Sequence, residues 1–454
     1  MSSGVPFVAT ARRCARRASA MRAAAAPGWS ISRRIIGVAG ALILAALPVA
    51  KAQAQDAAPA SKDGPAAATS DAATPKPAGA KIITILMARE LRDRLPPLSL
   101  LDQPPSDDGV AGAKLAIDDN NTTGKFLNQE FKLEVVENKS ADALISQVSA
   151  NVDRGISFIV TDVAADTLVK LADAIAGKPA VIFNAAAPDD RLREADCRAN
   201  VKHTAPSRSM LTDALAQYLS VKQWNKWLLV SGTAPEDKLF ADAVRRSAKR
   251  FGHKIVGELE FVYEVGSRRA DGGYEQIQQQ IPSFLQKGPT HDLVVVADEA
   301  EVFGDYFPYR TWESRPVVGT AGLFATSWHP AVELWGGTQF QNRFKRLANR
   351  NMRALDYNVW MAVRSVGEAA TRKRSGEPAD LIAYMLTPEF ELAAFKGRKL
   401  TYRDWNGQLR QPILVTTDKL HVTVSPQPQF LHQFSELDTL GIDRPESACK
   451  AYKK

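Results

Sequence analysis

Acidic side chains recur in the loops that follow the predicted strands of this 454-residue chain. Carboxylates from several such loops could together surround a hard cation with oxygen ligands, or hold a cationic organic ligand. Each one alone could equally cap a helix N-terminus or face solvent, because carboxylates favour the positive end of the helix dipole. If a cation is bound, the same carboxylates are its candidate ligands, and the metal is unknown. These residues are Asp107, Asp108, Asp162, Asp166, Asp189, Asp190, Glu236, Asp237, Asp298, Glu299 and Glu301.

Aromatic residues and one arginine form a second set of candidates. Tyr309, Trp312, Trp328 and Trp335 could form the walls of a pocket for an organic ligand. Packing within the fold would explain them equally well. Arg310, next to Tyr309, could hold an acidic group with two hydrogen bonds or pair with a nearby carboxylate. The predicted ligand-binding set is Asp107, Asp108, Asp162, Asp189, Asp190, Glu236, Asp298, Glu299, Tyr309, Arg310 and Trp328.

Catalytic motifs are missing from the sequence. The six histidines show no HExxH spacing, and no GxSxG nucleophile elbow occurs. Neither GxxxxGK[ST] nor GxGxxG is present, so no phosphate-binding loop or dinucleotide site is predicted. His329, beside Trp328, is interpreted as structural. The sequence therefore indicates a protein that is not an enzyme and needs no cofactor.

One stretch explains why the acidic loops should meet. Residues 82–87 form a short apolar run that fits a buried parallel strand, and 110–124 have the periodicity of a helix. The loop between them, 95–109, lies at the carboxyl end of the strand. In open α/β sheets that end is where ligands bind. The strand-end loops are therefore the first place to look for function.

Strand and helix patterns continue to alternate along the chain in two successive series. They predict an α/β fold with two doubly wound parallel-sheet lobes joined by a hinge. We expect the first lobe over 81–205 and 326–370, the second over 206–325 and 371–425, and a C-terminal tail over 426–454. Several chain crossings between lobes would form a cleft that opens and closes.

The N-terminus has the pattern of an export signal. Residues 1–54 carry eight basic residues and no acidic one, an apolar run over 35–50 and a small-x-small site at 52–54, which predicts a cleaved signal peptide. An uncleaved membrane anchor is the alternative, and Arg33-Arg34 permits twin-arginine export. Residues 55–80 read as a disordered linker. The mature protein is expected to be periplasmic.

The charge balance and the cysteines give two further predictions, about nucleic-acid binding and about a disulfide. The chain has 58 Lys and Arg against 50 Asp and Glu, but without 1–54 the two totals are equal, so no nucleic-acid partner is indicated. Cys197 and Cys449 stay after the leader is removed. In an oxidising compartment they are predicted to form a disulfide between the tail and the first lobe, with two free thiols as the alternative.

Segments over almost all of 81–420 follow the order of a known family. They are residues 82–87, 112–120, 159–165, 179–184, 203–207, 227–232, 316–323 and 356–360. On these segments the chain resembles the type I periplasmic solute-binding proteins, the Leu/Ile/Val-binding-like receptors of ABC importers. The resemblance implies a monomer that binds a small ligand between two lobes and delivers it to an inner-membrane permease.

A narrower resemblance rests on 296–299, 308–312, 408–412 and 437–443. These segments are similar to the subgroup of receptors associated with PQQ-dependent alcohol dehydrogenase systems. Related receptors in methylotrophs are linked to lanthanide uptake, so this resemblance implies an importer whose ligand could be a lanthanide or its chelate. A periplasmic ligand-sensing module for a signalling partner is the alternative function.

One departure from the family concerns the ligand. Amino-acid receptors of this fold usually have a Gly-Pro and Ser-Ser/Thr loop after the third strand, which gives N–H groups and hydroxyls to the ligand carboxylate. Here the segment 161–166 reads Thr-Asp-Val-Ala-Ala-Asp, and the loop at 185–190 is acidic as well. Asp162 would repel a carboxylate. An ordinary α-amino-acid ligand is therefore not expected.

Overall fold

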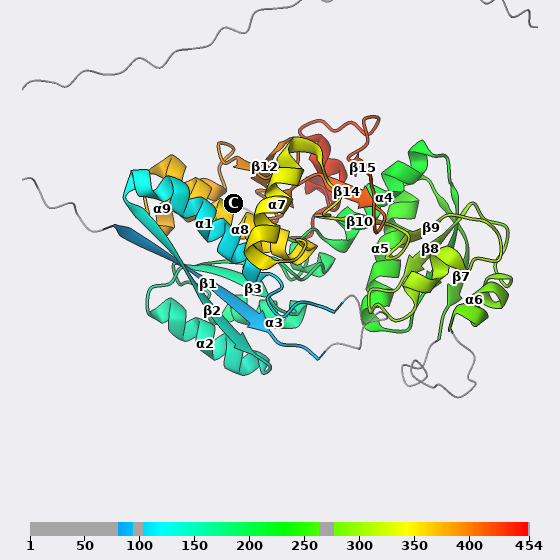
Figure 1. The fold of residues 1–454 in the computed structure, drawn as a ribbon, viewed down its shortest axis with the longest axis horizontal. Coiled ribbons are helices and arrows are strands. Elements are labelled where there is room, and N and C mark those ends of the chain that lie inside the picture. The colour runs from blue at the N-terminus through cyan, green and yellow to red at the C-terminus, as the bar shows by residue number, and fades with distance from the viewer. Residues whose placement is uncertain (1–79, 94–102, 263–276, 453–454) are drawn as a thin grey trace, which may run out of the picture. The chain divides into compact units, whose positions relative to one another are not determined.

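Two β-sheets with helices packed on both of their faces form the framework of the protein (Figure 1). The computed structural model describes residues 80–93, 103–262 and 277–452, and both sheets lie in one compact unit, Lys76–Lys454. The predicted signal peptide, 1–54, lies outside the described residues, as does the predicted linker apart from residue 80. Within the described ranges, no helix is long and apolar enough to cross a membrane.

The first lobe is built on a parallel sheet with the strand order β2-β1-β3-β4-β5. Side chains of β1 alternate between two cores: Ile85 and Met87 enter one, and Leu86 and Ala88 enter the other. Helices α1 and α8 cover the first core, and α2 and α3 the second. The elements are β1 (Lys81–Glu90), α1 (Val110–Gly124), β2 (Gln129–Asn138), α2 (Ala141–Asp153), β3 (Phe158–Asp162), α3 (Ala165–Ala174), β4 (Val181–Asn184), β5 (Val201–His203), α7 (Gly337–Ala348), α8 (Ala354–Lys373) and α9 (Pro378–Met385).

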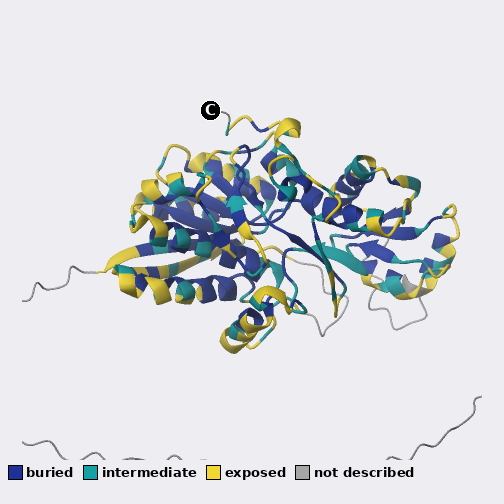
Figure 2. Cartoon of the chain, turned by 90° about the horizontal axis from the view of Figure 1, so that it is seen from above, coloured by how far each residue is buried: buried dark blue, intermediate teal, exposed yellow. Residues whose placement is uncertain are grey.

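The second lobe has a seven-stranded sheet with the order β15-β14-β10-β9-β8-β6-β7. Its strands also alternate between two cores, with Trp227 and Leu229 in one and Leu228 and Val230 in the other. Figure 2 shows buried residues inside both lobes and exposed ones on the outer helix faces. The elements are α4 (Arg208–Val221), β6 (Lys226–Ser231), α5 (Pro235–Phe251), β7 (Lys254–Glu260), α6 (Ile277–Leu285), β8 (Leu293–Ala297), β9 (Val317–Gly319), β10 (Leu323–Thr326), β14 (Ile413–Thr416) and β15 (His421–Ser425).

Local sequence explains where several helices begin and end. Ser140 and Ser207 precede α2 and α4, and each hydroxyl accepts a backbone N–H of the first turn at 3.3 Å. Pro235 is the first residue of α5, and Gly252 ends that helix with a φ of 75°, a conformation that glycine adopts without strain. Apolar residues four apart, such as Leu144, Val148 and Val152, then face the core.

The structure confirms the predicted α/β fold with parallel sheets. It differs from the prediction in two places. The second sheet is not wholly parallel, because β14 and β15 pair antiparallel at its edge. The segment 378–410, predicted in the second lobe, contributes Leu381, Leu392 and Leu400 to a core of the first lobe. The remaining elements of the described chain are β11 (Leu392–Ala393), β12 (Lys399–Tyr402), β13 (Leu409–Arg410), η1 (Lys125–Leu127), η2 (Asp190–Arg193), η4 (Gly304–Tyr309), η5 (Leu334–Gly336), η6 (Glu436–Thr439) and η7 (Arg444–Glu446).

The chain passes between the lobes after β5, after β10 and before β14. Two of these crossings are tied together: the Gln411 side-chain amide donates to the Thr204 carbonyl at 2.8 Å, and that of Gln408 donates to the Ala205 carbonyl at 3.1 Å. Both glutamines are buried. Adjacent crossing segments of this kind are the geometry that a hinge requires.

The C-terminal tail contacts both lobes. In the second lobe, the backbone N–H of Gly441 donates to Asp213 at 2.8 Å. In the first lobe, the N–H of Ala448 donates to Glu194 at 2.7 Å, and Cys449 is joined to Cys197 by a disulfide. The tail therefore links the two lobes by a route separate from the three crossings.

Candidate functional site

The predicted strand-end carboxylates fall into two groups in the structure. The first group gathers Asp107, Asp108 and Asp162 around arginines. Arg350 donates to Asp107 at 2.9 Å, and Arg92 donates to Asp162 at 3.0 Å. All of these residues belong to the first lobe. Asp107 and Asp162 therefore have short contacts to protein cations already.

Asp108 is the least compensated member of this first group. It is buried, its Oδ2 lies 3.7 Å from Arg353 Nε, and its Oδ1 has no hydrogen-bond partner. Burial and the neighbouring carboxylate of Asp356 raise the pKa of Asp108 to about 6, against the opposing effect of Arg353 and Arg350. The charged form of Asp108 is therefore less favourable in the folded protein than in the unfolded chain.

We expect Asp108→Asn to stabilise the protein more at pH 8 than at pH 4. A raised pKa means that the folded state binds the Asp108 proton more tightly than the unfolded state does, so wild-type stability falls as the pH rises from about 4 to about 6. Asn removes that charge. The gain of the variant over wild type should reach about 3 kcal/mol above pH 6 and disappear as the pH falls to about 4. Urea denaturation of both proteins across this range measures it, and a gain that does not change with pH would contradict the assignment.

The second group joins residues from both lobes around Arg208. This arginine is buried at the start of α4, and its Nη1 lies 3.2 Å from Asp189 Oδ2 of the first lobe. Its Nε donates to Glu299 Oε2 of the second lobe at 2.6 Å. Asp190 accepts the Ser209 N–H at 3.2 Å, so the loop after β4 is held against the N-terminus of α4.

Two carboxylates share one arginine in this second group. Burial raises the pKa of Glu299, Arg208 lowers it, and the carboxylates of Asp189 and Glu236 raise it further. Burial would lower the pKa of Arg208, but Glu299 and Asp189 raise it above its ordinary value. One cation is thus shared by carboxylates from both lobes, at the edge where the fold predicts the ligand.

Arg193 holds the first-lobe side of this group and was not found by the sequence analysis. It is fully buried in η2, and its guanidinium donates to the carbonyls of Ala187, Asp189 and Ala205 at 2.8–3.0 Å. It also donates to the Gln408 side chain at 2.9 Å. No sequence pattern distinguishes Arg193 or Arg208 from exposed arginines, because only the tertiary fold brings their acceptors together.

Four predicted site residues lie outside these two groups. Both oxygens of Asp298 accept backbone N–H groups of 302–304 at 2.5–2.9 Å, so Asp298 shapes its own loop. Tyr309 is 80% exposed, and Arg310 is also on the surface. Trp328 is buried and stacks on Tyr357 with ring centroids 4.8 Å apart, so it is a core residue rather than the wall of a pocket.

If the protein binds a cation, the same carboxylates are its candidate ligands. Within the residues that the structure describes, no group of three or more His, Cys, Asp or Glu side chains could hold a metal ion. Asp107, Asp162, Asp189 and Glu299 each have an arginine as neighbour.

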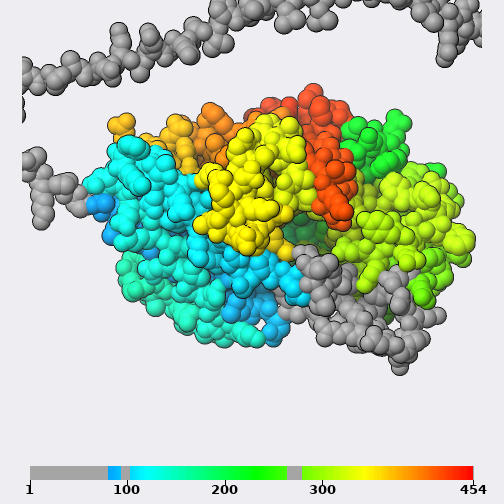
Figure 3. All heavy atoms as spheres, in the orientation of Figure 1, coloured from blue at the N-terminus to red at the C-terminus, as the bar shows by residue number. Residues whose placement is uncertain are grey.

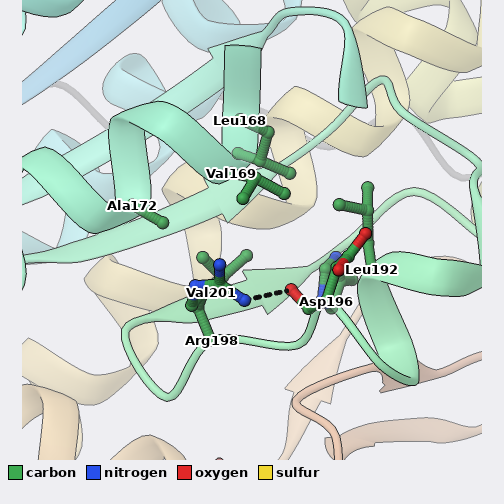
Figure 4. Close-up of a pocket in the computed structure, with 8 residues that line it drawn as sticks. Leu168, Val169, Ala172, Leu192, Asp196, Arg198 and Val201 are labelled. Atoms are coloured by element: carbon green, nitrogen blue, oxygen red, sulfur yellow. Dashed lines mark hydrogen bonds between the residues drawn. The ribbon is translucent and has the colours of Figure 1, made fainter. Parts of the chain in front are cut away.

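The space-filling view shows a hollow between the yellow segment that contains α7 and the yellow-green surface of the second lobe (Figure 3). A small cavity elsewhere, between α3, η2 and β5, is lined mainly by apolar residues such as Leu168, Ala172 and Val201 (Figure 4). His203 also lines it, and burial lowers the pKa of His203 well below 6.5, so its ring is neutral. This cavity holds none of the predicted site residues, and we assign it no ligand.

Comparison with known proteins supports the architecture. A family model described as "Periplasmic binding protein" matches residues 101–418. A search of curated proteins gave no match.

Several solved structures have the same fold. A branched-chain amino acid ABC transporter periplasmic ligand-binding protein from Burkholderia xenovorans is 18% identical with a TM-score of 0.65, covering 82% of this chain and 100% of that one. A leucine-, isoleucine-, valine-, threonine- and alanine-binding protein from Brucella ovis, in a closed conformation, is 13% identical (TM-score 0.59; 79% and 93%). A branched-chain amino acid transporter substrate-binding protein from Streptococcus pneumoniae, in complex with isoleucine, is 16% identical (TM-score 0.56; 76% and 99%). At these identities the likeness shows the fold alone.

Proposed function

Because the chain belongs to the periplasmic binding protein family, we propose that it is the substrate-binding component of an ABC importer. It acts in the periplasm after export, as a monomer, and presents its ligand to a permease in the inner membrane. The observation that carries the proposal is the contact of Arg208 with Asp189 and Glu299, which brings strand-end carboxylates of both lobes to one place.

The mechanism that we propose is a shift between open and closed forms. A ligand that contacts both lobes binds the closed form better than the open form, so it moves the equilibrium toward closure by that difference in affinity. The permease then recognises the closed form. The hydrogen-bonded crossings at Gln408 and Gln411 would serve as part of the hinge.

We further propose that the importer serves a PQQ-dependent alcohol oxidation system. Support comes from the resemblance of 296–299, 308–312, 408–412 and 437–443 to that subgroup. In the structure, three of these segments contain a side chain that accepts a hydrogen bond. Asp298 accepts the Val302 N–H, Gln408 accepts from Arg193, and Asp438 accepts from Arg403. Since no three described side chains form a metal site, we favour an organic ligand or a metal chelate over a bare ion.

Calorimetry and small-angle scattering on the purified protein test this function. We expect one of the probes (lanthanum ion, lanthanum citrate, short alcohols and diols, short amines, carboxylic acids and amino acids) to bind saturably and to reduce the radius of gyration. Arg208→Ala should weaken that binding at least tenfold. Arg245→Ala, which removes an exposed ion pair between α5 and β7, should leave it unchanged. Without saturable binding of any of these probes, the receptor proposal loses its support.

A further inference from the structure

The N-terminus of α3 is already occupied by a carboxylate of the protein itself. Glu90 is the last residue of β1 and is half-buried. Its Oε2 accepts the backbone N–H of Ala164 at 2.8 Å, and its Oε1 accepts the hydroxyl of the buried Thr167 at 3.1 Å. Ala164 stands at the N-cap position of α3 and has no side-chain oxygen of its own, so a glutamate from a neighbouring strand supplies the cap.

This position is suited to an anion. The first N–H groups of a helix have no partner within the helix, and the helix dipole favours negative charge there. The backbone N–H of Ala164 and the hydroxyl of Thr167 also lie just after β3, at the carboxyl end of a strand, where ligands of open α/β folds bind. In this chain, both donors are used by Glu90.

The charges around Glu90 make a second carboxylate unfavourable. Asp162, two residues before Ala164, is buried, and its oxygens contact Arg89 and Arg92. Asp166, in the first turn of α3, pairs with Arg191. A ligand carboxylate at this place would therefore lie beside Glu90 and Asp162, with the nearby arginines already paired.

We propose that Glu90 is a specificity-determining residue that closes the α3 N-terminus to carboxylate ligands. The ligand of the proposed receptor is then a polar molecule without a carboxylate at this position, either neutral, such as an alcohol, or cationic, such as an amine. The inference rests on the proposed function and adds to it the chemical class of the ligand.

Removing Glu90 should create an anion site that acetate can fill. In Glu90→Ala, we expect a lower melting temperature than in wild type and a saturable rise of that temperature with millimolar sodium acetate. Acetamide, or sodium chloride at equal ionic strength, should not reproduce the rise. Wild type and Glu134→Ala, which removes an exposed glutamate of β2, should not respond to acetate. An equal acetate response in Glu90→Ala and Glu134→Ala would overturn the inference.

A second experiment tests the binding of isoleucine and uses the wild-type protein alone. We expect no saturable binding of isoleucine to wild type by calorimetry. Carboxylate-dependent binding, present with isoleucine and lost with isoleucinol, would overturn the role of Glu90 while supporting a receptor function. Acetate rescue of Glu90→Ala, together with no binding of any probe to wild type, would support the role of Glu90 and leave the receptor function without support. If Glu90→Ala does not fold, the same acetate titration is made on Glu90→Ser.

Discussion

Removal of the Cys197–Cys449 disulfide is expected to lower the free energy of unfolding by about 2–5 kcal/mol. The bond joins residues 252 apart, so it restricts a very long loop of the unfolded chain. Near the disulfide, the tail has few other contacts to the first lobe: Ala448 donates to Glu194, and Tyr452 lies against Lys202 and Val201. Thermal and urea unfolding of Cys197→Ser/Cys449→Ser, compared with wild type, measure the loss.

Reduction and a tail variant provide the controls for this prediction. Wild type in a reducing agent should unfold like the double variant, because both lack the bond. Arg444→Ala removes an exposed ion pair of the same tail with Asp404 and should have a small effect, as surface pairs usually do. If alkylation of the non-reduced native protein labels both cysteines, or if the double variant is as stable as wild type, the disulfide does not stabilise the protein.

The sequence was sufficient to predict the buried parallel strands, because their apolar runs leave little choice of environment, but it did not show short or half-buried strands such as β10 and β15. Ile85, Leu86 and Met87 of β1, for example, are all fully buried in the parallel strand predicted over 82–87. The same pattern predicts which loops lie at the carboxyl ends of strands. That is why Asp189 and Glu299, 110 residues apart, could be placed in one candidate site before their contact with Arg208 was known.

The contacts that individual side chains make, and the directions in which they point, could not be predicted in the same way. The burial of Arg193 and Arg208 depends on hydrogen-bond acceptors that come from distant segments, because charged residues are rarely buried without such partners. Trp328 was a candidate pocket wall, but the stack on Tyr357 places it in the core. The cap on α3 comes from Glu90 of another strand rather than from the helix's own sequence, so no local capping pattern could show it.

Replacement of Arg208 is expected to have the largest effect within the candidate site. Arg208→Ala would leave the half-buried Glu299 and Asp189 without their shared, buried cation, and breaking such a pair typically lowers the free energy of unfolding by about 3–5 kcal/mol. Arg208→Lys keeps the charge but has one ammonium in place of a planar guanidinium, so it should contact only one carboxylate well and lose less. Urea unfolding at pH 7.5 ranks the three proteins.

The pH dependence separates a charge effect from a loss of packing. Burial already raises the pKa of Glu299 in wild type, and removal of Arg208 takes away the cation that opposes this. The folded variant then binds the Glu299 proton more tightly than the unfolded chain does, so the deficit of Arg208→Ala should be large at pH 8 and shrink toward pH 5. Addition of Glu299→Gln should recover part of the stability at pH 8. A deficit that is equal at both pH values, with no recovery in the double variant, would mean that Arg208 acts through its packing and that the charge balance between the lobes is not what holds them at this place.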